Sequence, residues 1–211
     1  MTSSTKNHPP LTREKILGAA IHLFQQHGFS GLGMRQIADC LQIKAPSLYY
    51  HFESKDDLAR SALQHYREEQ FYRLQEIEKL DGLTEKLYAY SELFAEMLND
   101  EKRLCLYLVM VREASFQQEP CVSELRLFAK QNIDWLEDTL CQAKKESPQT
   151  IETERDMAEI IFASLEGIMA TSLIDESPCT HFRSKAKSFL NIICIQPLNK
   201  KQALIALESA L

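Results

Sequence analysis

Hydrophobic residues recur every three to four positions along most of the chain, which is the spacing that places them on one side of an α-helix. Ile16, Ala20 and Phe24 form the first stripe, between a capping Thr12 and a terminating Gly28. The same spacing, with turn residues as breaks, predicts further helices at about 34–41, 45–51, 54–80, 83–98, 101–116, 119–146, 150–174, 179–195 and 198–210. No stretch alternates with a period of two for long enough to predict a strand, so we expect an all-α protein.

The spacing of the breaks divides the chain into three parts. Residues 1–10 are polar, end in two prolines and are expected to form a disordered arm. Residues 11–54 carry three short helices, and residues 55–211 carry a long connecting helix followed by a helical domain. With 211 residues and 45% hydrophobic side chains, the chain is large enough to bury a substantial core.

Residues 28–58 show the pattern of a helix-turn-helix, two short amphipathic segments around a tight corner. Ile37 and Leu41 mark the inner side of the first segment, and Leu48 and Phe52 mark that of the second. The opposite side of the second segment carries side chains that can reach phosphates or base edges, namely Lys44, Ser47, Tyr49, Tyr50 and His51. We therefore expect this segment to enter the major groove of DNA.

In extent and order this block resembles the DNA-binding domain of the TetR/AcrR family of bacterial transcriptional regulators. The resemblance implies a three-helix DNA-binding head, followed by a helical domain that dimerises and binds a small molecule. It also implies DNA contacts from Ser47, Tyr49, Tyr50 and His51. Their neighbours at helix starts, the long cations Arg35, Lys44 and Lys55, are expected to reach phosphates or guanine edges.

The block departs from the family pattern at three positions. Gln42 stands where the turn usually has glycine, so a left-handed backbone there would cost about 1 kcal/mol. Lys44 replaces the usual serine cap of the recognition helix and cannot accept a backbone N–H. Gly33 replaces a serine or threonine and lacks the hydroxyl that could reach phosphate. These changes suggest a DNA site different from that of better-capped relatives.

The distribution of charge favours the N-terminal part as the DNA-binding part. The net charge is −6, but residues 1–60 hold 7 Lys and Arg against 5 Asp and Glu, whereas residues 61–211 hold 17 against 25. The modestly basic part is therefore the one suited to nucleic acid. The acidic remainder should repel DNA.

Two later segments predict a homodimer. Residues 157–174 are apolar around most of the helix, which requires cover on every side, and residues 182–193 form a second apolar stripe. Paired across two subunits, these helices would form a four-helix bundle. The residues expected at the interface are Ile161, Leu165, Ile168, Phe182, Phe189, Leu190 and Ile193. An ordinary monomeric core is the alternative.

The effector pocket and a sensor cysteine are the least defined features of the sequence. Apolar and aromatic side chains expected to line the pocket, with one thiol, are Cys105, Tyr107, Met110, Phe128, Trp135 and Phe162. Residues 102–106 resemble the cysteine-containing helix of a TetR subgroup that includes electrophile- and oxidant-responsive repressors. Lys102 and Arg103 would lower the pKa of the Cys105 thiol there. A buried, unreactive cysteine is the alternative reading.

These features together predict a homodimeric repressor that binds a palindromic double-stranded DNA operator and is released by a small-molecule or electrophile inducer. We expect no cofactor and no metal site, because the six cysteines lack zinc spacing and should be reduced thiols. We also expect no enzymatic activity, because none of the six histidines is an obvious base for Cys105. No membrane segment or leader is recognisable, so a cytoplasmic protein is expected. The alternatives are an all-α enzyme with Cys105 as nucleophile and a constitutive DNA-binding protein without an effector.

Overall fold

The computed structural model describes residues 12–99, 102–113, 119–144 and 153–194. All regular secondary structure in these ranges is α-helical, as predicted. The helices are α1 (Arg13–His27), α2 (Met34–Cys40), α3 (Ala45–His51), α4 (Lys55–Glu78), α5 (Leu83–Asn99), α6 (Leu106–Val111), α7 (Glu119–Lys144), α8 (Glu154–Ser172) and α9 (Pro178–Cys194).

Local capping explains why the first helices begin and end where the sequence predicts. The Thr12 side chain accepts from Lys15 N at the start of α1, and Gly28, with φ 70°, ends it. The Ser54 side chain accepts from Asp57 N at the start of α4. Side-chain oxygens at these positions satisfy backbone N–H groups that the first turn leaves without partners.

One predicted helix is much shorter than expected. The periodicity predicts a helix over 101–116, but α6 covers only Leu106–Val111. Lys102 has a left-handed backbone with φ 55°, and the segment up to Cys105 is irregular, so the chain turns before the helix begins. The predicted arm at 1–10 and the predicted helix at 198–210 lie outside the described residues.

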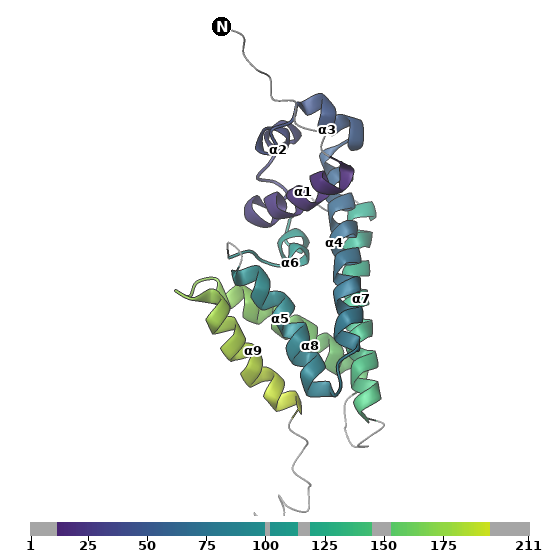
Figure 1. Cartoon of the computed structure of the whole chain (residues 1–211), viewed down its shortest axis with the longest axis vertical. Helices are drawn as coiled ribbons and strands as arrows, with labels where there is room; N and C mark the ends of the chain where they lie inside the picture. The colour runs from purple at the N-terminus through teal and green to yellow at the C-terminus, as the bar shows by residue number, and fades with distance from the viewer. Residues whose placement is uncertain (1–11, 100–101, 114–118, 145–152, 195–211) are drawn as a thin grey trace, which may run out of the picture.

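The helices form two groups joined by a long pair (Figure 1). Helices α1, α2 and α3 lie together at one end, while α5, α8 and α9 lie at the other. Helices α4 and α7 pack against each other and run from the first group towards the second. A displacement at one end of α4 can therefore be transmitted to the other.

The hydrophobic core of the head extends beyond the three short helices. Phe24, Ile37, Leu48 and Phe52 are fully buried at its centre. The same cluster continues into α4, α6 and α7 through Leu58, Ala59, Ala62, Leu63, Leu106, Met110, Cys121 and Leu125. The core thus crosses the expected domain boundary between residues 54 and 55.

A second hydrophobic cluster fills the other end of the molecule. It is built from the second half of α4 together with α5, α7, α8 and α9. Its largest fully buried side chains include Tyr90, Phe128 and Phe182. Within the described residues, the helices include none with the length and hydropathy needed to cross a membrane.

Candidate DNA-binding head and regulatory core

The turn between α2 and α3 is tight because Gln42 adopts the left-handed conformation. Its φ is 54°, and Ile43 N donates to Ala38 O at 3.0 Å across the turn. Leu41 N continues the helical pattern by donating to Ile37 O at 3.0 Å. The left-handed backbone considered for Gln42 is therefore present, and the packing of the head must offset its cost.

The caps of the two short helices differ from each other. Gly33 supplies no side chain, but its backbone N–H donates to the Gln36 side chain at 2.7 Å, which is one half of a capping box. Lys44 precedes α3 without any side-chain cap, and Ser47 N is satisfied by Lys44 O at 2.8 Å. Lys44 therefore leaves its ammonium group available at the surface.

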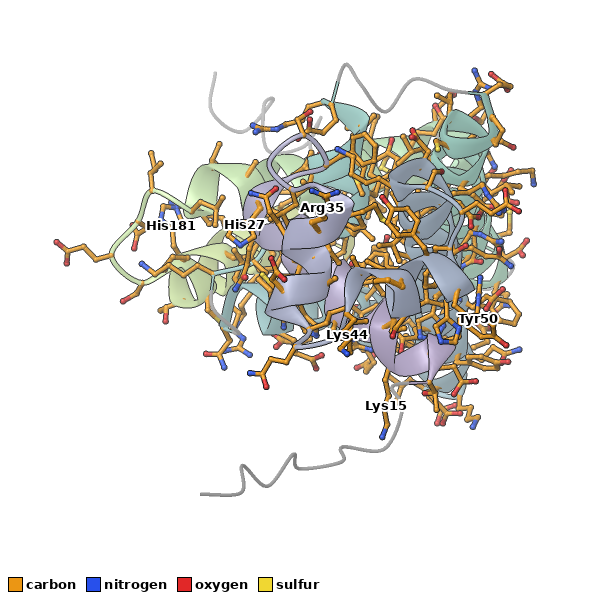
Figure 2. The ribbon with its side chains drawn as sticks, turned by 90° about the horizontal axis from the view of Figure 1, so that it is seen from above. Lys15, His27, Arg35, Lys44, Tyr50 and His181 are labelled. Carbon is orange, nitrogen blue, oxygen red and sulfur yellow. The ribbon has the colours of Figure 1, made fainter. Side chains whose placement is uncertain are left out.

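Helix α3 presents a polar and aromatic outer surface over a fully buried inner one. Tyr50 is 85% exposed and Tyr49 is 50% exposed, although large aromatic side chains are usually covered. His51 is half-buried and meets the ring of Tyr50 edge-on, with centroids 5.1 Å apart. Arg35, Lys44 and Tyr50 lie at the head end of the molecule (Figure 2).

Among the expected DNA contacts, Lys55 has its charged group directed towards Phe29 within the head. Its ammonium donates to Phe29 O at 3.1 Å and lies 4.1 Å from the centroid of the Phe29 ring. The first turn of α4 is also occupied, because Ser54 caps it and the Asp57 carboxylate accepts from Glu53 N at 3.2 Å. In this conformation Lys55 stabilises the head, and the expected phosphate contact does not follow from its geometry.

A hydrogen-bonded joint connects α1 to the segment before α6. The Gln25 side chain donates to Leu104 O at 2.8 Å and accepts from the Arg103 guanidinium at 3.3 Å. The same guanidinium lies 3.4 Å from His22 Nε2. We call Gln25, Arg103 and Leu104 the α1 joint. It fixes the head to the rest of the chain at a point distant in sequence.

A second contact connects the head to the end of α6. The Ser30 hydroxyl donates to the Glu113 carboxylate at 2.7 Å. The same carboxylate lies directly against Gly28, where an added Cβ would collide with it and where φ is already 70°. Gly28 is therefore favoured by its left-handed backbone, whereas the Glu113 carboxylate, at the end of a flexible side chain, could shift away from an added Cβ.

Three of the expected pocket residues meet in one row of aromatic rings. Tyr66 stacks on Phe128 with centroids 5.4 Å apart, and Phe128 stacks on Tyr107 at 5.5 Å. Tyr107 also contacts Phe162 at 5.5 Å. We call these four side chains, from α4, α7, α6 and α8, the ring stack. The sequence did not single out Tyr66.

The other expected pocket residues lie around the ring stack or away from it. Trp135 stacks on Tyr90, with centroids 5.3 Å apart. Met110 is buried in the core of the head instead, so it does not share the cluster of the ring stack. A buried amide lies close by, because Asn132 accepts from both the Tyr90 hydroxyl at 3.0 Å and Gln70 Nε2 at 3.2 Å.

Cys105 is a buried thiol and is only 1% exposed. The Tyr66 hydroxyl lies 3.6 Å from its sulfur. Burial, together with the nearby Glu166 carboxylate, raises the pKa of the thiol well above its usual value. The lowering expected from Lys102 and Arg103 is wrong, because the Arg103 guanidinium reaches towards α1 instead of the sulfur.

Glu166, which the sequence analysis missed, is the most unusual residue of the regulatory core. It is 4% exposed, and neither carboxylate oxygen has a hydrogen-bond partner. Burial raises the pKa of Glu166 to about 7. The nearby Cys105 thiol, which lacks the geometry of a hydrogen bond, acts in the opposite direction. The available signal was that Glu166 is the one charged residue between Ile160 and Ile174.

The dimer interface expected from the sequence is wrong for four residues. Ile161, Leu165, Phe182 and Leu190 are fully buried within a single chain, because they form the contact between α8, α9 and α5. They are therefore not available to a second copy. The remaining expected residues, Ile168, Phe189 and Ile193, are only half-buried.

Another side of α8 is open to the surroundings. Ile160 is 45% exposed, and Ile174, just beyond the helix, is 94% exposed. Between them lie the small exposed residues Ala163, Gly167, Ala170 and Thr171. On α9, Ile192 is 71% exposed. We call the side of α8 that carries Ile160, Ala163, Gly167 and Ala170 the open face of α8.

The fold and the head together define a class of protein, namely a helix-turn-helix DNA-binding head on a helical regulatory domain. Residues 16–62 match the family model described as bacterial regulatory proteins, tetR family. The family model, the curated relatives and the solved structures together support a TetR/AcrR family transcriptional regulator. This agrees with the family expected from the sequence.

Curated relatives support the assignment mainly through the head. The chain is 44% identical over 59 residues to an HTH-type transcriptional regulator of Saccharopolyspora erythraea, and 33% identical over 94 residues to the repressor KstR2 of Mycolicibacterium smegmatis. These matches cover 28% and 44% of this chain, and only 25% and 45% of the relatives. A longer match, 27% identical over 177 residues, covers 80% of this chain and 81% of the regulator AcrR of Shigella flexneri.

Solved structures share the fold over most of the chain. A TetR-family regulator from Agrobacterium tumefaciens superimposes with a TM-score of 0.78 at 24% identity, covering 85% of this chain and 95% of that one. FadR from Bacillus subtilis, solved in complex with stearoyl-CoA, superimposes with a TM-score of 0.69 at 16% identity, covering 83% and 96%. At these identities the likeness extends to the fold alone.

Proposed function

We propose that the chain is a homodimeric transcriptional repressor that binds a palindromic operator and is released from it by a small hydrophobic effector. The observation that carries this proposal is the outer surface of α3, where Lys44, Tyr49 and Tyr50 are exposed over a buried inner side. Exposed tyrosines beside a cation suit phosphate and base contacts better than they suit solvent. Repression is supported by the relative KstR2, which is named a repressor.

Release by an effector is supported by the way the head is attached. The α1 joint and the Ser30–Glu113 hydrogen bond connect the head to residues at both ends of α6. An effector that displaces the ring stack would move Tyr107 in α6 and Tyr66 in α4, and so move the head. FadR, which shares the fold, was solved with a ligand, stearoyl-CoA. Two heads whose separation changes can no longer engage both half-sites.

The proposed dimer uses the open face of α8 rather than the residues named from the sequence. Small residues at Ala163, Gly167 and Ala170 would allow two such helices to approach closely. Exposed Ile160 would add apolar contact there. A two-fold dimer brings two α3 helices to the two halves of a palindrome.

We propose no enzymatic activity for the chain. The rival reading requires Cys105 to act as a nucleophile, and a thiol must be deprotonated to do so. Its burial and its raised pKa both argue against that role.

The test of the proposed function is operator binding by the full chain. We expect footprinting on the DNA that flanks the gene to show a protected palindrome. Tyr50→Ala should change the preference between operator variants, and Tyr49→Ala or His51→Ala should weaken binding to all of them. Tyr72→Ala is the matched control, because Tyr72 is 66% exposed but lies on α4. Equal losses for Tyr50→Ala and Tyr72→Ala, or the absence of any protected site, would contradict the proposal.

A further inference from the structure

We propose that the regulatory core binds a hydrophobic organic cation, with its positive group against the Glu166 carboxylate and its apolar body against the ring stack. This inference rests on the proposed function, since it assigns the chemical class of the effector. It begins from a buried acid that the folded chain leaves without a partner.

An isolated carboxylate in a protein interior is costly, and buried polar groups nearly always have partners. Both oxygens of Glu166 lack one. The two cations closest to Cys105 in sequence are directed elsewhere, since Arg103 contacts α1 and Lys102 acts on Asp175. The polar groups that act on Glu166 among the described residues therefore include no cation that would neutralise it. A positively charged ligand would supply the missing partner.

The side chains around Glu166 suit such a ligand in their chemistry as well as in charge. The hydroxyl-bearing rings of Tyr66, Tyr90 and Tyr107 are each affected by the negative charge of Glu166, which places all three near it. Two of these rings belong to the ring stack. Aromatic ring faces attract ammonium groups, most strongly where water is excluded. A carboxylate near aromatic rings favours a hydrophobic cation over an anion or a neutral molecule of the same shape.

Flexible side chains border this place and can make room for a ligand. Met97 accepts from the Tyr66 hydroxyl at 3.1 Å, and Met169 accepts from Cys105 N at 3.4 Å. Methionine side chains readily change conformation and repack around a guest molecule. Cys105 is also adjacent to Leu104, whose carbonyl is held by Gln25 of α1. Displacement around Glu166 would thus reach the head through the α1 joint.

The experiment compares two probes of the same shape but different charge. The cation is naphthylmethyl-trimethylammonium, and the neutral probe carries a tert-butyl group in place of the trimethylammonium. Equilibrium dialysis with the full wild-type chain should show the cation bound at least about tenfold more tightly. Glu166→Gln should remove this preference, lowering affinity for the cation while leaving the neutral probe nearly unchanged.

Glu159→Gln is the matched control, since it removes an exposed acid from the same helix and should keep the preference. Equal affinities of the wild type for the two probes, binding of neither, or a preference that persists in Glu166→Gln would each overturn the proposal. The wild-type comparison decides even if a variant does not fold. Operator binding is measured separately without probe, so failure of the proposed repressor function would be visible independently of this site.

Discussion

Glu166, the proposed ligand-binding acid, lowers the stability of the fold, because its carboxyl group is buried without a hydrogen-bond partner. A glutamine or leucine would satisfy the core of α8 equally well in size, yet the chain buries a carboxyl group there without a hydrogen bond. Burial raises its pKa from 4.5 to about 7, so the group is close to half-charged near neutral pH. A ligand that pairs with the charged form would therefore stabilise the fold as it binds.

The first prediction follows from this raised pKa. Between pH 4.5 and 7 the folded chain holds the Glu166 proton that the unfolded chain has released. The stability contributed by that proton is complete below pH 4.5 and lost as pH rises through 7. Glu166→Gln does not titrate, so its free energy of unfolding should gain about 2–3 kcal/mol relative to the wild type between pH 5 and pH 8.

Urea unfolding of both chains across this pH range measures the difference. Asp134→Asn is the comparison, because hydrogen bonds and charge from Lys130 and Arg155 lower the pKa of Asp134. The excess stability of the wild type over Asp134→Asn should therefore shrink as pH falls. A difference between Glu166→Gln and the wild type that stays constant with pH would show that the carboxyl group is not desolvated.

The second prediction concerns the strained turn residue. Gln42 has φ 54°, a conformation that glycine adopts without a steric penalty. Gln42→Gly should raise the free energy of unfolding by about 0.5–1 kcal/mol, after allowing for the greater freedom of glycine in the unfolded chain. Asp39→Gly, at an exposed position inside α2, should lower it by a similar amount. Thermal unfolding that shows the same sign for both changes would contradict this account.

Among the elements, α3 begins without a side-chain cap, because the cation Lys44 stands at its N-cap position. The third prediction is that Lys44→Ser supplies the missing cap and stabilises the fold by about 1 kcal/mol. The same change removes a charge from the proposed DNA surface, so operator affinity should fall and its salt dependence should weaken by about one ion. Lys15→Ser is the control, because it removes an exposed cation from α1 and should leave the start of α3 unchanged.

Chemical denaturation and operator titrations at several salt concentrations measure the two effects. If Lys44→Ser weakens neither the affinity nor the salt slope, Lys44 does not contact DNA. If it fails to stabilise the fold, the start of α3 is satisfied in another way.

Helix positions were predictable because amphipathic spacing and capping residues are local signals. The start of α4 at Ser54 follows from residue type and neighbouring pattern, whereas the left-handed Gln42 could be considered only because the family usually has glycine at that position. The facing of α8 was not predictable. A helix that is apolar almost all round carries no information on which apolar side contacts its own chain, so Ile161 and Leu165 were assigned to a partner although they are buried within the chain.

The site was predictable only where exposure and chemistry coincide along one short helix. The outer side of α3 could be predicted from residue spacing. In a helix of seven residues, the position of the buried side also fixes the opposite, exposed side. The ring stack and Glu166 could not, because they come together from α4, α6, α7 and α8 through packing at long sequence separation. The direction of the Arg103 side chain likewise depends on α1, about 80 residues earlier in the chain.

At the scale of the whole molecule, the fourth prediction tests the dimer. A side chain added at Gly167 meets only open space within the chain. Gly167→Glu should therefore keep or raise the stability of the protomer, since glycine weakens a helix, while placing a charge on the open face of α8. We expect sedimentation to show a shift from dimer to monomer at micromolar concentration, with reduced operator affinity.

Leu127→Glu provides the control, because Leu127 is 42% exposed and lies on α7, outside the open face of α8. It should leave the dimer intact. A dimer that survives Gly167→Glu, or one that Leu127→Glu disrupts to the same extent, would place the interface on another surface.

The shared core of the head has a consequence for how such proteins can be recombined. Because Leu58, Ala62 and Leu63 of α4 close the head, and Leu106 and Met110 of α6 complete it, a cut after residue 54 leaves an open apolar surface. A chimera that joins this head to a foreign regulatory domain must keep the first half of α4 and match the partner residues of α6 and α7. Head exchange between relatives, in the laboratory or in evolution, is therefore limited by the match of this shared hydrophobic core as much as by operator sequence.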